Sequence, residues 1–317
     1  MVHPGNPNMP SIPTRRDFLK MSLLTGASWA GMGLLAQNRL GAIEPIARVG
    51  RPRFKLSLVG YSFRGYFAEK DPAKRITMFD FVDFCADQGF SGAELTGYYF
   101  QQPITEDWLI ALKRHAYLRG VAVSGTATKT EFTHVDRAKI VEEIASVKSW
   151  VRNAVVLGAP YLRIFAGHAK FMQTKERKDA CIAALEECAE YAGTKGIYLG
   201  MENDGGLGPD EFLYIVHGVR SPWFALNLDL GNFHTDDVYR DLAKCAPYAV
   251  NIHFKKMIQQ AGKPPEPADI PRMLRILADA NYQGYLALEY EEEEDPYKAI
   301  PPWKRDVAAA LKQADLG

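Results

Sequence analysis

The sequence carries no net charge and no close pair of cysteines. Its 317 residues include 38 basic and 38 acidic side chains, so the overall charge favours neither a nucleic-acid partner nor an anionic membrane surface. Four cysteines are spread along the chain without a CxxC pair, which indicates buried hydrophobic side chains rather than a disulfide framework. A glycine-rich phosphate loop is also missing, which argues against a phosphorylated substrate. A hydrophobic content of 47% is typical of a globular protein with a large core.

A long hydrophobic run is missing as well. The apolar stretch from Met21 to Ala36 is too short and too rich in glycine for a membrane span. It follows Thr14–Lys20, which contains the pair Arg15-Arg16, and this arrangement resembles a twin-arginine (Tat) export signal. An ordinary N-terminal helix or a Sec signal is the alternative interpretation.

The resemblance to a Tat signal divides the chain. We expect residues 1–42 to be a signal peptide, residues 43–53 a linker, and residues 54–317 the folded domain. Cleavage after Ala36 or Ala42 would release the protein into the periplasm without a membrane span, whereas an uncleaved segment would tether it to the membrane.

From Phe54 onward, short β-prone runs alternate with amphipathic helical patterns, as in a repeated βα unit. The expected strands are 55–61, 91–95, 121–125, 161–165, 197–199, 224–228, 248–252 and 285–288. The expected helices are 73–88, 106–119, 136–157, 175–194, 209–217, 236–245, 270–279 and 302–314. Eight of each predict an α/β fold, a single-domain (β/α)8 TIM barrel.

Four of these strands are each followed by a side chain that can bind a divalent cation. They are Glu202, Asp229, His253 and Glu289, at spacings of 27, 24 and 36 residues that leave room for one crossover helix each. Because the carboxyl ends of parallel barrel strands share one mouth, these side chains should converge. Three carboxylates and one imidazole form a hard site that suits Mn²⁺, Mg²⁺ or Zn²⁺.

The phrases around these residues resemble those of the xylose isomerase-like TIM barrels, a superfamily of sugar (phosphate) isomerases and epimerases that shares its fold with endonuclease IV. The resemblance covers roughly residues 54–315 and rests on Met201-Glu202-Asn203, Leu228-Asp229-Leu230-Gly231-Asn232, His253 with Lys255, and Leu288-Glu289. It implies that Glu202, Asp229, His253 and Glu289 bind one divalent metal (Mn, Mg, Co or Zn). It also implies that Glu202 and Glu289 are the catalytic acid/base pair. Relatives are frequently dimers or tetramers, so a homo-oligomer is a further expectation.

Such a site suits enolisation of a sugar. A cation near a ketose or aldose carbonyl acidifies the adjacent C–H, and two carboxylates can remove and return the proton. The expected function is therefore a metal-dependent sugar isomerase or epimerase that works through an enediolate, with a small carbohydrate as substrate. Elimination from a keto-sugar or a sugar-derived keto acid by a lyase or dehydratase is the alternative.

Four more residues are candidates for substrate binding. Lys255 lies two residues beyond His253 and so on the same strand face, where it can meet negative charge or form a structural salt bridge. Asn232, His168 and Glu94 stand at or just after the ends of expected strands. Many epimerases of the superfamily have a histidine at the position of Asn232 here, which leaves the substrate open.

Two other function classes fit less well. A nuclease resembling endonuclease IV would need further histidines at the first three strand ends, where this chain has Ser62, Glu94 and Thr126. The neutral charge also disfavours a DNA-binding groove. A non-catalytic carbohydrate-binding barrel stays open, although the presence of both Glu202 and Glu289 argues against it.

Overall fold

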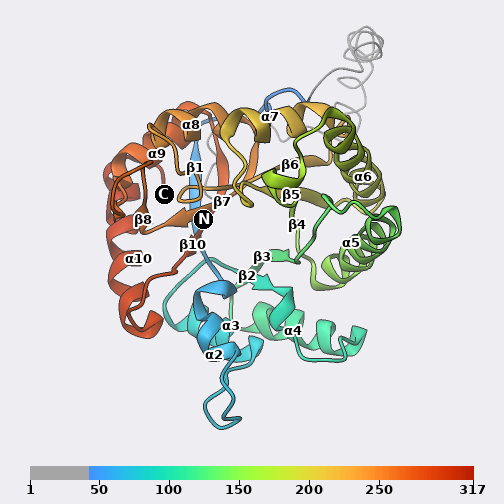
Figure 1. The fold of residues 1–317 in the computed structure, drawn as a ribbon. Coiled ribbons are helices and arrows are strands. Elements are labelled where there is room, and N and C mark those ends of the chain that lie inside the picture. Colours follow the sequence, from blue (N-terminus) through green and yellow to red (C-terminus); the bar gives the residue numbers. More distant parts are fainter. Residues whose placement is uncertain (1–42) are drawn as a thin grey trace, which may run out of the picture. The chain divides into compact units, whose positions relative to one another are not determined.

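Eight parallel strands close into a barrel with helices on the outside, as predicted from the sequence (Figure 1). The structure, a computed structural model, describes residues 43–317. Around the barrel the strands follow the order β1-β10-β7-β6-β5-β4-β3-β2, and every neighbouring pair is parallel. All eight strands therefore direct their carboxyl ends to the same mouth.

The barrel strands are β1 (Arg53–Val59), β2 (Gly92–Thr96), β3 (Ala122–Ala127), β4 (Tyr161–Phe165), β5 (Tyr198–Glu202), β6 (Phe224–Asp229), β7 (Ala249–Lys255) and β10 (Gln283–Glu289). The outer helices within residues 43–317 are α3 (Met78–Asp87), α4 (Glu106–Leu118), α5 (Arg137–Leu157), α6 (Lys175–Thr194), α7 (Pro209–Gly218), α8 (Val238–Cys245), α9 (Ile270–Asp279) and α10 (Pro296–Gln313). A one-turn helix, α2 (Arg64–Phe67), and a small hairpin, β8 (Met257–Ile258) with β9 (Glu266–Pro267), lie in the loops after β1 and β7. Neither was predicted.

Capping residues set the helix ends. Thr77 and Asp80 form a capping box that starts α3 at Met78, five residues later than the sequence pattern suggested. Gly158 takes a left-handed φ of 74° and ends α5, where a side chain would be strained, as its position in the sequence predicted. The predicted start of α10 at Pro302 is wrong, because Asp295 caps the helix and Pro296 occupies its first turn.

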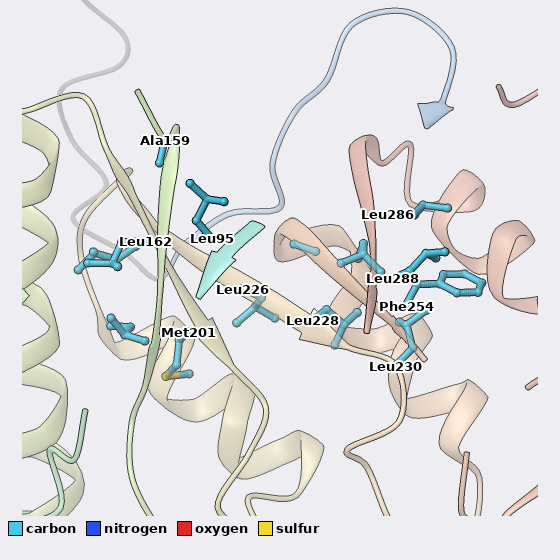
Figure 2. Packing of buried hydrophobic residues seen from close by; sticks show 14 of the residues in the cluster. Leu95, Ala159, Leu162, Met201, Leu226, Leu228, Leu230, Phe254, Leu286 and Leu288 are labelled. Atoms are coloured by element: carbon cyan, nitrogen blue, oxygen red, sulfur yellow. The ribbon is translucent and has the colours of Figure 1, made fainter. Parts of the chain in front are cut away.

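The strands alternate between two environments. Leucines such as Leu226 and Leu228 in β6 pack outward into the layer between barrel and helices, together with Met201, Phe254 and Leu288 of neighbouring strands (Figure 2). The residues between them turn to the barrel interior. Most of these interior side chains in β5, β6, β7 and β10 are polar; they are Glu202, Asn227, Asp229, Asn251, His253, Lys255 and Glu289. The predicted ligands are thus among the last inward positions of their strands rather than loop residues.

The stretch predicted to be a linker packs on the amino-terminal end of the barrel. It has no regular secondary structure before Arg53, but Ile46 N donates to Pro247 O at 2.9 Å and Arg48 Nη2 donates to Ala249 O at 2.5 Å. The Arg48 guanidinium also lies 5.0 Å from the centre of the Tyr282 ring. The predicted export signal, residues 1–42, lies outside the described residues. Across residues 43–317, no helix combines the length and the apolar character that crossing a membrane requires.

Candidate metal centre

The four predicted ligands meet at the carboxyl end of the barrel. Glu202, Asp229, His253 and Glu289 end or nearly end β5, β6, β7 and β10, which are neighbours in the closed sheet. The lateral register places Asp229 beside His253 across β6 and β7. One potential ligand atom from each side chain lies within 4.8 Å of all the others, and all four residues are buried.

The polar atoms at this point fit a metal ion. Glu202 Oε2, Asp229 Oδ2 and His253 Nδ1 are buried and make no hydrogen bond of good geometry, although Arg163 and Lys255 lie within ion-pair distance of the two oxygens. A buried polar atom without a hydrogen bond is costly, so three of them directed at one point suit a shared cationic partner. The Nδ1 atom lies 3.2 Å from Glu289 Oε2, 3.5 Å from Glu202 Oε1 and 3.9 Å from Asp229 Oδ2. Three carboxylates and one imidazole can therefore hold one divalent ion here.

Two cations lie beside the carboxylates. Lys255 Nζ is 2.8 Å from Glu289 Oε2 and 3.2 Å from Asp229 Oδ2, and it also pairs with Glu291. Arg163 Nε is 2.9 Å from Glu202 Oε2, and the Arg163 guanidinium lies 4.1 Å from the centre of the Phe165 ring. Arg163 is therefore a direct neighbour of a candidate ligand.

Burial and charge together shift the protonation of this group. Burial disfavours the imidazolium form of His253, but the carboxylates of Glu94, Glu289 and Glu202 outweigh it and raise the His253 pKa well above its usual value. Burial raises the pKa of Asp229 well above its usual range, although Lys255 opposes the shift. Burial acts the same way on Glu289, but there Lys255 and His253 prevail and hold its pKa well below the usual value. Without a metal ion, the negative charge of the carboxylates is therefore offset by protons on His253 and Asp229 and by the ammonium group of Lys255.

An asparagine fixes two of the strand ends to each other. Asn203 Nδ2 donates to Asp229 O at 2.9 Å, and Asp229 N donates to Asn203 Oδ1 at 2.7 Å. Asp229 Oδ1 in turn accepts from Gly231 N at 2.7 Å, which leaves Oδ2 directed at the other ligands. The tip of β5 therefore orients the ligand of β6.

A cavity of about 530 Å³ opens above the ligands. Its lining includes Glu202 and Glu289 and three of the four residues predicted to bind substrate, namely Lys255, Asn232 and His168. The fourth, Glu94, is fully buried, is not part of the lining, and contacts His253 from below instead. Other lining residues that the sequence did not single out as site residues are Tyr98, Lys129, Glu131, Glu143, Arg163, Phe165 and Asp204.

The sequence matches the family described as xylose isomerase-like TIM barrel over residues 82–313. The chain belongs to this family. Among curated proteins, 73 residues are 36% identical to the uncharacterized protein Spy1535 of Streptococcus pyogenes serotype M6. That match spans 23% of this chain and only about half (53%) of the relative.

Solved structures of the same fold cover most of the barrel. A xylose isomerase domain protein from Planctomyces limnophilus has a TM-score of 0.66 at 14% identity, covering 83% of this chain and 99% of that chain. An L-ribulose 3-epimerase has a TM-score of 0.65 at 16% identity, over 83% and 97%. A probable 3-DHS dehydratase, AsbF of Bacillus anthracis, has a TM-score of 0.60 at 16% identity, over 80% and 99%. At these identities the likeness is one of fold.

Proposed function

We propose that this protein is a divalent-metal-dependent isomerase or epimerase that acts on a small carbohydrate. The observation that carries the proposal is the convergence of three carboxylates and one imidazole on the floor of an open cavity. Membership of the family and the similarity of fold to an L-ribulose 3-epimerase support an isomerase-type enzyme. We infer that Glu202, Asp229, His253 and Glu289 would hold one ion of Mn, Mg, Co or Zn.

The two glutamates are placed to exchange a proton with a substrate carbon. They stand on β5 and β10, which β6 and β7 separate around the barrel, so they approach the floor of the cavity from different directions. A bound divalent ion would supply the Lewis acidity that stabilises an enediolate. Glu289, whose pKa is held low, is ready to accept a proton from a C–H group, and Glu202 to return one to the other face.

Other side chains of the cavity suit a sugar. Tyr61, Tyr98 and Phe165 offer aromatic surface on its walls, and Asn232 and His168 offer hydrogen-bonding groups. Burial raises the pKa of Tyr98 to about 12, so its hydroxyl stays protonated at neutral pH. Lys255 is close enough to the ligands to meet negative charge that develops on a substrate oxygen.

Elimination by a lyase or dehydratase is the second candidate. It uses the same enediolate, but a leaving group departs from the neighbouring carbon instead of a proton returning. Two observations support it: Asn232 lines the cavity where many epimerases have histidine, and a probable 3-DHS dehydratase shares the fold. A 3-keto-sugar would suit such chemistry, because the acidified C–H then lies beside a leaving group.

We also propose export by the Tat route to the periplasm. The support for this proposal is Arg15-Arg16 ahead of a weakly apolar stretch. Fusing residues 1–42 to a reporter that fluoresces only when exported folded tests it. Export that is lost on replacing Arg15 and Arg16 by lysines supports the proposal, and export that survives the replacement contradicts it.

Deuterium exchange from solvent tests the chemistry. The metal-loaded wild type, offered a panel of ketoses and 3-keto-sugars in D₂O, should introduce deuterium beside the carbonyl of its substrate. Glu289→Gln should lose this exchange by about 10²–10⁴-fold, the usual contribution of a general base. Glu293→Gln, which changes an exposed acid four residues further on, is the matched control and should exchange like the wild type.

The products separate the two candidates. Deuterium in an isomer or epimer supports the isomerase, whereas deuterium accompanied by loss of water or an alcohol supports the lyase. A metal-loaded wild type that exchanges no substrate in the panel would contradict both.

A further inference from the structure

Glu94 lies directly beneath the candidate metal centre. It stands in β2 and is fully buried. Its Oε1 atom is 2.9 Å from Nε2 of His253. Its Oε2 atom accepts from the Asn251 side-chain amide at 3.0 Å and from the Tyr161 hydroxyl. Both oxygens of this buried carboxylate are therefore satisfied, and Oε1 is used by the imidazole.

The chemistry of this contact decides which histidine nitrogen faces the ligands. A carboxylate oxygen only accepts hydrogen bonds, so Nε2 of His253 must be the donor. The nitrogen left over is Nδ1, which points to Glu289, Glu202 and Asp229 and has no hydrogen bond of its own.

We propose that Glu94 is the positioning residue of the metal centre: by accepting the Nε2–H of His253 it fixes Nδ1 as the metal-binding atom. The inference rests on the metal centre of the proposed function and assigns a role to a residue outside the cavity. A carboxylate behind a metal-bound histidine orients the ring and raises its basicity, and losing it typically weakens metal binding by about 10–100-fold.

The surroundings hold Glu94 in this orientation. The Tyr161 ring fits a space that glycines leave open, since a Cβ at Gly125 would lie 2.1 Å from a ring carbon. Asn251, the other donor, is itself held by Asn227 at 2.7 Å. The two donors come from different strands, β4 and β7, which β5 and β6 separate in the barrel, so rotation of the carboxylate would break both bonds.

This arrangement makes the isosteric change informative. In Glu94→Gln the amide oxygen faces the NH₂ group of Asn251, which also donates to Asn227, whereas the Tyr161 hydroxyl can either donate or accept. The NH₂ group then faces Nε2 of His253, so a donor meets a donor. To accept a hydrogen bond from this NH₂ group, the neutral His253 ring must move its proton from Nε2 to Nδ1. This move removes the Nδ1 lone pair that the metal ion needs.

The test is the dissociation constant for Zn²⁺, measured by competition with a chromophoric chelator. We expect Glu94→Gln to bind Zn²⁺ about 10–100-fold more weakly than the wild type. The matched control is Tyr161→Phe, which removes a hydrogen bond to the same carboxylate but leaves the acceptor at Nε2, and it should change the constant less than about threefold. In a protein that already carries His253→Ala, Glu94→Gln should change the Zn²⁺ dissociation constant by less than about threefold, because Glu94 acts through the His253 ring.

Three results would overturn the inference. The first is a Zn²⁺ affinity of Glu94→Gln equal to that of the wild type. The second is a loss of Zn²⁺ affinity in Tyr161→Phe as large as that in Glu94→Gln. The third is that Glu94→Gln weakens Zn²⁺ binding as much in the His253→Ala protein as in the wild type. A wild type that binds none of Zn²⁺, Mn²⁺, Co²⁺ and Mg²⁺ would instead overturn the proposed function. These failures are distinguishable, because only the last involves the unmodified protein.

A measurement on the wild type needs no variant to fold. In the Zn²⁺-loaded protein with ¹⁵N-labelled histidine, NMR should show His253 with its proton on Nε2 and the metal on Nδ1. The reverse assignment would overturn the inference.

Discussion

Lys255 competes with a divalent ion for the same oxygens. Its ammonium contacts Asp229 Oδ2 and Glu289 Oε2, both at the convergence point of the ligands. Two unit charges about 4 Å apart interact by about 4 kcal/mol at an effective dielectric constant near 20. A fixed cation at this distance therefore weakens metal binding while it stabilises the metal-free protein.

Replacing Lys255 by methionine should tighten Mn²⁺ binding by at least about tenfold, because the repulsion between two cations is removed. The same variant without metal should unfold at a lower temperature than the wild type, since Asp229 and Glu289 lose their partner. Chelator competition and thermal unfolding measure the two effects. Lys129→Met, which removes an exposed lysine of the cavity wall, is the control. Weaker Mn²⁺ binding in Lys255→Met would contradict this account.

Metal affinity should fall as the pH falls. In the metal-free protein the pKa values of His253 and Asp229 are both raised, and each must lose its proton before it can bind a metal ion. The low pKa of Glu289 means that it contributes no such proton near neutrality. Affinity should therefore keep rising above pH 6.5, the usual histidine value, instead of levelling there. Calorimetry in buffers of different ionisation enthalpy should detect protons released on binding at neutral pH, and a pH-independent affinity would be the opposite result.

At the scale of single elements, a glycine in β3 makes room for a large side chain in the barrel interior. Gly125 in β3 lies against the Tyr161 ring, and a Cβ there would approach one ring carbon to 2.1 Å. The ring is buried inside a closed barrel, so it cannot move aside without breaking its bond to Glu94.

Gly125→Ala should therefore destabilise the protein by roughly 1–3 kcal/mol, the usual range for overpacking a core. Gly65→Ala is the matched control: it stands in helix α2 with no atom within 4 Å of its added Cβ, so it should be neutral or slightly stabilising. Urea unfolding measures both. Equal stability of the two variants would show that the interior around Tyr161 is looser than the structure indicates.

The sequence predicted the strands that carry the candidate ligands, but not the contacts between distant strands that hold these residues in place. All eight barrel strands and the convergence of the four candidate ligand residues followed from apolar runs with such residues at barrel spacing. Each strand that bears a candidate ligand runs one to three residues further than predicted, because a polar inward residue such as Asp229 or His253 ends an apolar run in the sequence but not a strand in a polar barrel. An apolar sequence pattern detects residues that are buried in apolar surroundings. It misses these residues because they are buried among polar side chains.

Contacts between distant strands could not be predicted in this way. Glu94 and His253 are separated by 159 residues in the sequence. No local sequence pattern records which strand ends face each other across the barrel. The contact between Arg163 and Glu202 could not be predicted for the same reason. The hairpin β8–β9 escaped notice because its strands are only two residues long, too short for an alternating pattern.

At the scale of the whole molecule, the segment before β1 belongs to the folded unit. Asn281 Nδ2 donates to Arg48 O at 2.8 Å and Gln283 Nε2 donates to Val49 O at 3.0 Å, in addition to the bonds of Ile46 and Arg48 to the residues around the start of β7. These contacts join residues more than 190 positions apart and lie at the end of the barrel opposite the cavity.

A protein that begins at Arg53 should therefore be less stable than one that begins at Ile43, by roughly 2–6 kcal/mol if each of the four lost bonds is worth about 0.5–1.5 kcal/mol. Arg48→Ala in the longer protein should reproduce part of the loss, and Glu44→Ala, an exposed change in the same segment, should not. Thermal unfolding of the metal-free proteins measures the difference. Identical unfolding temperatures would show that the segment is a linker after all.

The central claim is that this barrel holds one divalent ion at the ends of β5, β6, β7 and β10. The most direct measurement is the metal content of residues 43–317 after incubation with Mn²⁺, Co²⁺, Mg²⁺ or Zn²⁺ and dialysis, compared with that of the His253→Ala/Asp229→Ala variant. The account predicts one ion per chain for at least one of these metals in the wild type and none in the variant. No stoichiometric ion in the wild type, or equal content in both proteins, would contradict it.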